Sequence, residues 1–236
     1  MENSFSSDAG EATKITRGSL RTPRAAAFAG IAFSLILGTA LVLVRIAVPS
    51  DPADAGSWVE DGWRKDAVVL ALSLVPFAGL AFLWFIGVIR DRIGPAEDRL
   101  FATVFLGTGL LFVAMLFVAA ATAAGLIEAE TKGGTAISPG VWNFARHTTY
   151  LVLTVYAMRM ASIFTLVTTT IMTRLRIIPR WLTAVGLVVA VALLLTVESL
   201  AWAVMLFPLW VLVLGIHFLV HPPADRATDD RATQPR

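Results

Sequence analysis

Six long apolar runs determine what this chain can fold into, because water cannot dissolve six such segments whereas a lipid bilayer can. They make up most of a chain that is 57% hydrophobic. Most runs supply the ~20 residues that a helix needs to cross about 30 Å of hydrocarbon, where the backbone must satisfy its own hydrogen bonds. The runs lie at about 25–49, 67–90, 100–126, 148–173, 181–197 and 200–220. The sequence therefore predicts an all-α fold, a polytopic transmembrane helix bundle with six spans.

Basic residues are divided unequally between the two sides of such a bundle. One alternating set of segments contains thirteen Lys and Arg residues, and the opposite set contains five. The first set is Lys14, Arg17, Arg21, Arg24, Arg90, Arg92, Arg99, Arg174, Arg176, Arg180, Arg226, Arg231 and Arg236; the second is Arg45, Arg64, Lys65, Lys132 and Arg146. Because cytoplasmic loops retain Lys and Arg and the number of spans is even, we expect both termini in the cytoplasm, N-in/C-in, and a multi-pass protein of the cell membrane.

The two ends of the chain differ in composition from its apolar centre. Residues 1–24 and 221–236 are rich in Ser, Thr, Asp, Ala and Arg without apolar periodicity, so we expect flexible cytoplasmic tails around a transmembrane domain at 25–220. The polar stretch before the first run is too long for a signal peptide, so we expect the first helix to be retained. The net charge is only +2 and the basic residues flank the spans, which argues against a nucleic-acid partner.

The side chains that usually carry chemistry are scarce. The chain has no cysteine, which removes disulfides, thiol nucleophiles and thiolate metal sites. Its three histidines do not form a haem or metal site in the expected topology, since His147 belongs to the outer end of the fourth span and His217 and His221 to the inner end of the sixth. No nucleophile elbow, phosphate-binding glycine loop or zinc-protease motif is present. We expect no enzyme activity, no cofactor and no metal.

The fourth span carries a polar stripe that begins near the middle of the bilayer. Arg159 lies fifteen residues before Arg174, which places it deep in the span. At about 100° per residue, five polar side chains fall within an arc of roughly 120°, and we expect that face to point inward. They are Arg159, Ser162, Thr165, Thr169 and Thr173. The stripe could line a half-channel or bind an anionic headgroup, or it could hold helices together.

An arginine at that depth calls for a counter-ion or a water-filled cavity. Glu198 is the best partner in the sequence, because the fifth span is short and would place the turn after it below the outer interface. Arg45, near the outer end of the first span, competes for the same carboxylate. The alternative is that Glu198 is simply solvated at the outer surface.

Small residues recur every four positions in the first span. Ala26, Gly30, Ser34 and Gly38 form the small-xxx-small pattern that lets two helices approach closely. We expect a helix-packing face, whose partner is either another helix of the chain or a second copy. In the fifth span, Gly186 and Ala190 offer a matching surface of small side chains.

Two further features concern the shape and ends of the spans. Pro76 in the second span and Pro208 in the sixth should kink their helices. In the outer loops, Trp58, Trp63 and Trp142 are typical of side chains that anchor a protein in the headgroup region, with a substrate vestibule as the alternative.

One turn resembles a known group of proteins. The segment Arg176-Ile177-Ile178-Pro179-Arg180-Trp181-Leu182-Thr183-Ala184-Val185-Gly186 is similar to the cytoplasmic turn of uncharacterised bacterial multi-pass integral membrane proteins, domains of unknown function with six or seven helices. The resemblance covers about a tenth of the chain. It implies a bacterial inner-membrane location and the same topology, and it implies no activity or catalytic residue.

Three functions are compatible with these patterns. The first is a non-enzymatic accessory or scaffolding subunit of a membrane or envelope complex, with membrane lipids and a protein as partners. The second is a small transporter or lipid-handling protein that uses the intramembrane arginine and its Ser/Thr stripe. The third is an intramembrane lipid-modifying enzyme, which would have to rely on Glu198 and His147.

Overall fold

The structure is a computed structural model that describes residues 23–48, 57–93, 99–132, 137–195 and 202–221. Helices form nearly all of this part of the chain, which contains no strand, and this confirms the all-α prediction. The elements are α1 (Pro23–Ala47), η1 (Ser57–Val59), α2 (Gly62–Ile93), α3 (Arg99–Lys132), α4 (Pro139–Leu151), η3 (Val152–Ala157), α5 (Met158–Arg174), α6 (Arg180–Leu195), η4 (Ala203–Met205) and α7 (Leu206–Val220). Residues 1–22 and 222–236 of the two predicted tails, and Glu198, lie outside the described residues.

Five helical segments are long and apolar enough to cross a membrane. They are Ala25–Ala47, Gly62–Arg90, Leu100–Thr131, Pro139–Arg174 and Ala203–Val220. The fourth combines α4, the π-helical turn η3 and α5 without a break. The remaining predicted span corresponds to α6, which has 16 residues and rises only about 24 Å. The coarse prediction of a helical multi-pass bundle therefore agrees with the structure, while the predicted fifth span is a shorter apolar helix.

Several helices continue past the apolar runs that predicted them. The second was expected at 67–90 and covers Gly62–Ile93, and the third was expected at 100–126 and covers Arg99–Lys132. The fourth begins at Pro139 instead of 148. A helix needs no apolar side chains once its backbone bonds are made internally, so these helices extend beyond their apolar segments.

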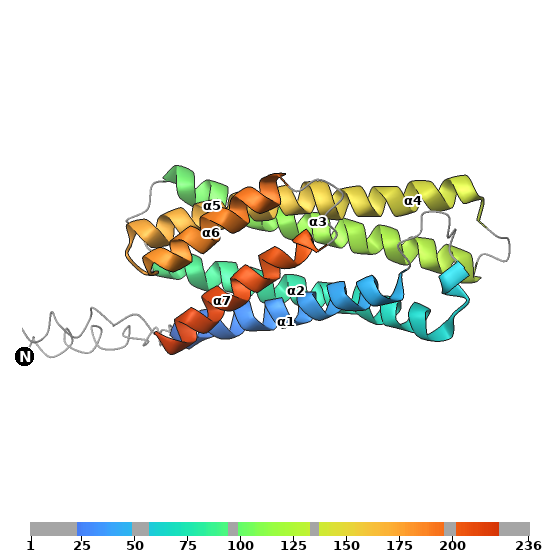
Figure 1. The fold of residues 1–236 in the computed structure, drawn as a ribbon, viewed down its shortest axis with the longest axis horizontal. Helices are drawn as coiled ribbons and strands as arrows, with labels where there is room; N and C mark the ends of the chain where they lie inside the picture. Colours follow the sequence, from blue (N-terminus) through green and yellow to red (C-terminus); the bar gives the residue numbers. More distant parts are fainter. Residues whose placement is uncertain (1–22, 49–56, 94–98, 133–136, 196–201, 222–236) are drawn as a thin grey trace, which may run out of the picture.

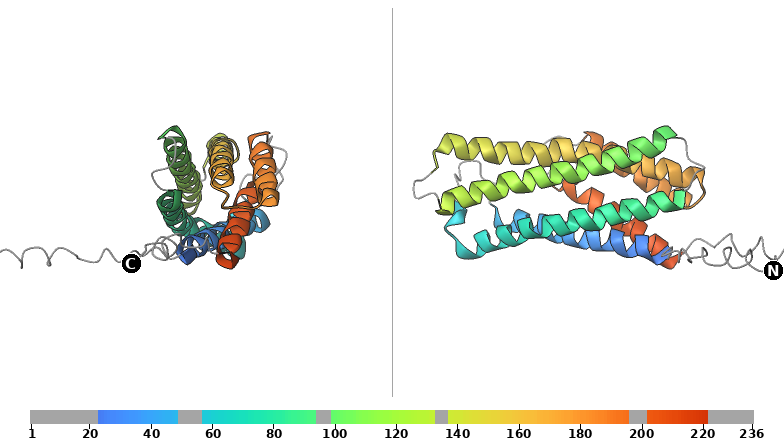
Figure 2. Two further views of the ribbon diagram at one scale, coloured as in Figure 1. Left: turned by 90° about the vertical axis from the view of Figure 1, so that its left-hand side faces the viewer. Right: turned by 180° about the vertical axis from the view of Figure 1, so that it is seen from behind.

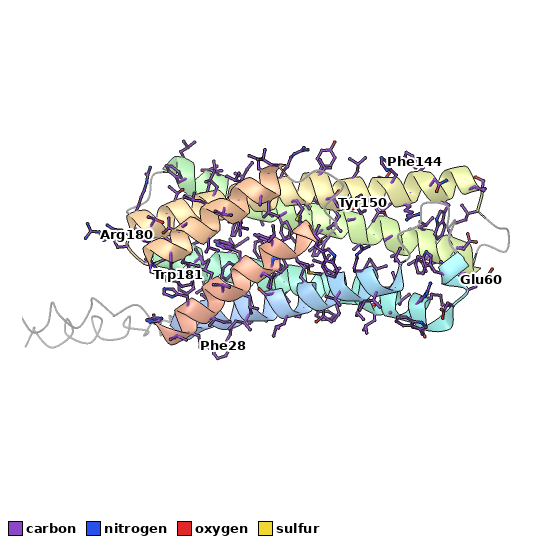
Figure 3. The ribbon with its side chains drawn as sticks, viewed as in Figure 1. Phe28, Glu60, Phe144, Tyr150, Arg180 and Trp181 are labelled. Atoms are coloured by element: carbon purple, nitrogen blue, oxygen red, sulfur yellow. The ribbon has the colours of Figure 1, made fainter. Side chains whose placement is uncertain are left out.

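The helices α1 to α5 follow one long axis, and α6 and α7 run at an angle to it (Figures 1 and 2). Going round the bundle, α1 packs against α2 and α7, α7 against α6, α6 against α5, and α5 against α3, which closes on α2. We call the end at which α2 and α5 finish and α6 begins the basic end, because it carries Arg90, Arg174 and Arg180. The opposite end, where α2 and α4 begin near Glu60 and Gly140, is the far end; Figure 3 labels Arg180 and Glu60. The α6 and α7 helices occupy only the half of the bundle nearer the basic end (Figure 1).

A cluster of phenylalanine rings fills the centre of the bundle. Phe82 of α2 lies 4.6 Å from Phe33 of α1, measured between ring centroids, and 5.1 Å from Phe164 of α5. Phe112 of α3 lies 4.8 Å from Phe207 of α7. All five rings are fully buried, so side chains from five helices meet in one tightly packed aromatic core.

A second, smaller core closes the far end. Trp58 of η1 and Trp142 of α4 meet edge to face with ring centroids 6.4 Å apart, and both are buried against Val68 and Ile127. The sequence led us to expect both tryptophans in the headgroup region, and the structure instead places them inside this core. Trp63 is exposed, as an anchoring residue would be. The difference arises because the extended ends of α2, α3 and α4 form an apolar contact of their own.

The two prolines behave differently. Pro76 lies inside α2 and removes a backbone donor from the middle of that helix. Pro208 does not interrupt a helix, because α7 begins at Leu206 and proline is tolerated in a first turn. The predicted kink at Pro208 is therefore replaced by a helix start, preceded by the short turn η4.

Candidate functional site

Arg159 lies on the outer surface of the bundle. Its side chain is exposed and shares that face of the helix with Tyr156 and Leu166, which are exposed as well. Among the residues that the structure describes, no carboxylate lies within 4 Å of its guanidinium. The sequence led us to expect the whole stripe to point inward. Because Arg159 is at the edge of the 120° arc, a rotation that buries Thr165 turns Arg159 outward.

Arg159 lies at the depth where α6 ends. Ser162 of α5 is level with Ala190 of α6, since their side-chain and backbone oxygens are 2.7 Å apart, and the two helices run antiparallel. Arg159, three residues before Ser162, is therefore level with Leu193, which lies three residues after Ala190 and two residues before the end of α6. The backbone of Arg159 is therefore about 22 Å along the helix from that of Arg174 at the basic end.

The rest of the stripe forms the contact between α5 and α6. The Ser162 hydroxyl donates to the Ala190 carbonyl at 2.7 Å, and the Thr173 and Thr183 hydroxyls lie 2.9 Å apart. Thr165 is also fully buried, and its hydroxyl donates to the Ala161 carbonyl of its own helix at 2.8 Å. Ser162, Thr165 and Thr169 are thus buried, on a different side of α5 from the exposed Arg159. Thr173, at the end of the helix, is exposed. The stripe is a polar seam between two helices.

Thr169 lies at the centre of this seam beside a glycine. A Cβ placed on Gly186 would collide with the Thr169 side chain and come within 3.1 Å of the Trp210 Nε1 of α7. The Thr169 hydroxyl and the Trp210 N–H are both buried and have no hydrogen-bond partner in the structure. Three helices therefore meet here. Two polar groups without a hydrogen-bond partner lie next to the position that a Cβ on residue 186 would occupy.

Arg45 and Glu198 complete the set of charged candidates. Glu198 falls in 196–201, outside the described residues, so its predicted pairing with Arg159 stays a prediction. Arg45, which we expected as a rival for that carboxylate, lies over the Trp202 ring with 5.7 Å between its guanidinium carbon and the ring centroid. This contact connects the end of α1 to the residues that precede α7.

The small residues of α1 face two neighbouring helices. Ala26, Gly30 and Ser34 are buried, and a Cβ on Gly30 would come within 3.0 Å of the Phe85 ring of α2 and 3.5 Å of Val211 of α7. Gly38 has no neighbour within 4 Å of such an atom. Gly186 and Ala190, which offered a matching surface of small side chains, lie against α5.

The histidines form no metal site in the described part of the chain, which contains no cluster of three His, Cys, Asp or Glu residues that could hold an ion. His217 and His221 stack with ring centroids 5.0 Å apart at the basic end. His147 is exposed on α4, at a different level of the bundle.

The structure contains two cavities that the sequence did not predict. A groove of about 590 Å³ runs between α2 and α3 in the far half of the bundle. Apolar side chains line most of it, and its polar residues gather toward the far end. The lining includes Val69, Leu72, Pro76, Phe117, Ala121 and Ala124, with Lys65, Glu128 and Thr131 at the polar end. The proline and the run of alanines were the available signals, since α2 lacks a helix hydrogen bond and α3 carries small side chains here.

The second cavity lies at the basic end, at the turn between α5 and α6. Its volume is about 490 Å³, and its lining residues are Thr173, Arg176, Ile178, Arg180 and Thr183. The turn is the same segment that resembles other membrane proteins, although the sequence alone gave no indication of a cavity.

Comparisons of this chain with protein-family models, with curated proteins and with solved structures find no match.

Proposed function

We propose that this protein is a non-enzymatic accessory or scaffolding subunit of a membrane complex, with six spans and both termini in the cytoplasm of a bacterial inner membrane. Its partners are membrane lipids and at least one other membrane protein. The observation that carries this proposal is the position of Arg159, an exposed charged side chain in the middle of the apolar helical segment Pro139–Arg174, on the outer surface of the bundle.

Lipid is a poor environment for that side chain. An arginine at the centre of a span costs ~2.5–3.5 kcal/mol on insertion scales, so such residues pair with a charge or reach water. The aromatic core supports a docking role over transport, because the centre of the bundle is filled by rings and the Ser/Thr seam joins two helices. A partner helix with an Asp or Glu at the same depth would neutralise Arg159, and the exposed Tyr156 and Leu166 would pack against it.

The test is native purification of the full chain in lipid nanodiscs, followed by mass spectrometry of the intact complex. We expect a stoichiometric protein partner with the wild type, retained by Arg159→Lys and weakened at least about tenfold by Arg159→Met. Arg45→Met is the matched control, because Arg45 is also an exposed arginine and its described contact is with Trp202 of the same chain.

Glu198 provides the competing explanation. If it is the counter-ion, Glu198→Gln and Arg159→Met should each lower thermal stability, with non-additive effects in the double variant. Non-additivity together with an unchanged partner would overturn the docking role of Arg159.

A second candidate function, lipid handling, is supported by the groove between α2 and α3. Its apolar walls suit an acyl chain, and Lys65 and Glu128 at its polar end suit a zwitterionic headgroup. The same mass spectra decide between the two functions: a lone protein that retains one lipid species would favour lipid handling over the accessory role.

A further inference from the structure

The cavity at the turn between α5 and α6 has the features of an anion site. Arg176 and Arg180 line it from the two sides of the turn, with Thr173 and Thr183 between them. No carboxylate is part of its lining, and no described carboxylate lies within 4 Å of either guanidinium. The surrounding sequence is equally one-sided, because no Asp or Glu occurs between Glu130 and Glu198.

The backbone at Arg176 adds an independent observation. Helix α5 ends in a Schellman motif, in which the Ile177 N–H bonds the Met172 carbonyl at 2.9 Å and the Arg176 N–H bonds the Thr173 carbonyl at 3.1 Å. The residue at this position of the motif has a left-handed conformation and is usually glycine. Here it is Arg176, with φ of 54°, the only non-glycine residue with positive φ among those described. An arginine is therefore held where glycine would fit with less strain, and such outliers often mark functional positions.

The start of α6 supplies further polarity. The Leu182 and Thr183 N–H groups bond the Pro179 carbonyl, at 3.0 and 3.1 Å, so the donors that the first turn of α6 leaves open are the N–H groups of Arg180, which lines the cavity, and of Trp181 after it. The Thr173 and Thr183 hydroxyls, 2.9 Å apart, join the two helices, and both residues line the cavity. Two guanidinium groups and a helix N-terminus thus surround one cavity, a combination that suits phosphate oxygens.

The position of the cavity identifies the source of the phosphate. Trp181, the residue after Arg180, is 57% exposed at the basic end (Figure 3), where an aromatic side chain lies at headgroup level. Basic pockets between helices on the cytoplasmic side of a membrane suit anionic lipid headgroups. We propose that this cavity binds the phosphate group of an anionic phospholipid, with Arg176 and Arg180 as the binding residues.

The decisive variant is Arg176→Gly. It removes one guanidinium and places glycine at a position of positive φ, so the fold should be as stable as the wild type or more stable, while lipid binding weakens. The full chain is reconstituted in phosphatidylcholine nanodiscs with and without phosphatidylglycerol. The retained phosphatidylglycerol is counted by mass spectrometry of the intact particle, and unfolding is followed by heating.

We expect wild-type protein to retain phosphatidylglycerol, Arg176→Gly to retain several-fold less, and the double variant Arg176→Gly/Arg180→Gln about tenfold less. Arg90→Gln is the matched control, because Arg90 is an exposed arginine at the same end and lies outside the cavity. An equal loss of lipid in Arg90→Gln would overturn the proposal, since diffuse surface charge would then explain retention.

A separate arm distinguishes lipid from soluble phosphate. Inorganic phosphate is added to wild-type protein in phosphatidylcholine nanodiscs at constant ionic strength. Stabilisation by inorganic phosphate without retention of phosphatidylglycerol would overturn the lipid as the source, and the absence of both effects would overturn the site itself. The accessory-subunit proposal depends on Arg159 and is unaffected by either result.

Discussion

At Gly186 three helices pack so closely that there is no room for a side chain. Replacement by alanine would push a methyl group into Thr169 and to within 3.1 Å of the Trp210 Nε1, and both side chains are too buried to move aside easily. We expect Gly186→Ala to lower the free energy of unfolding by about 1–2 kcal/mol, because overpacking of 1–3 kcal/mol exceeds the helix-propensity gain of up to ~1 kcal/mol. Thermal or denaturant unfolding in detergent measures the change.

The control for this change is Gly107→Ala in α3. A Cβ at Gly107 meets no atom within 4 Å, so only the propensity gain remains and stability should stay unchanged or rise slightly. Equal effects of the two substitutions would contradict the close contact at Gly186. The sequence identified Gly186 as part of a small surface, but small-residue spacing contains no information about which helix lies opposite it.

The same limit applies to Arg159. Spacing along the helix placed it correctly with respect to Arg174, because rise per residue is fixed. Its direction could not be predicted, since a polar arc of 120° leaves open which edge the neighbouring helices cover.

Among the elements, the pair α5 and α6 depends on hydrogen bonds between helices. We expect Ser162→Ala, which removes the 2.7 Å bond to the Ala190 carbonyl, to lower stability by roughly 0.6–1.7 kcal/mol, from the average to the maximum found for hydrogen bonds between membrane helices. Unfolding in lipid or detergent gives the value. Ser34→Ala is the matched control and should change stability less, because the Ser34 hydroxyl is equally buried but bonds the Gly30 carbonyl of its own helix at 2.8 Å. Equal losses would refute a special role for the seam.

Element boundaries show what hydropathy can and cannot predict. The apolar runs located α1, α2, α3, α5, α6 and α7, since only segments that satisfy their own backbone bonds can be so apolar. They did not predict that α2, α3 and α4 continue toward the far end, because helix ends are determined by turns, caps and tertiary contacts that hydropathy does not contain. The small core around Trp58 and Trp142 follows from these extensions and was missed for the same reason.

At the scale of the whole molecule, the ring of helices has two chemically different ends. Arg90, Arg174, Arg176 and Arg180 gather at the basic end, and Glu60, Asp61 and Asp66 are among the residues near the far end. The unequal distribution of Lys and Arg between alternating segments predicted this division from the sequence. The helix directions agree with it, because α1, α3 and α6 begin at the basic end while α2, α5 and α7 finish there (Figure 1). The division gives the proposed orientation a direct test.

That test uses the absence of cysteine, which leaves no background for thiol labelling. Single cysteines are introduced at Gly140 in the first turn of α4 and at Arg90 near the end of α2, both exposed and at opposite ends of the bundle. With the basic end in the cytoplasm, a membrane-impermeant maleimide should label Gly140→Cys in intact cells and Arg90→Cys only after permeabilisation. The reverse pattern would place the basic end outside. Labelling of both in intact cells would show that the bundle does not separate two compartments in one orientation.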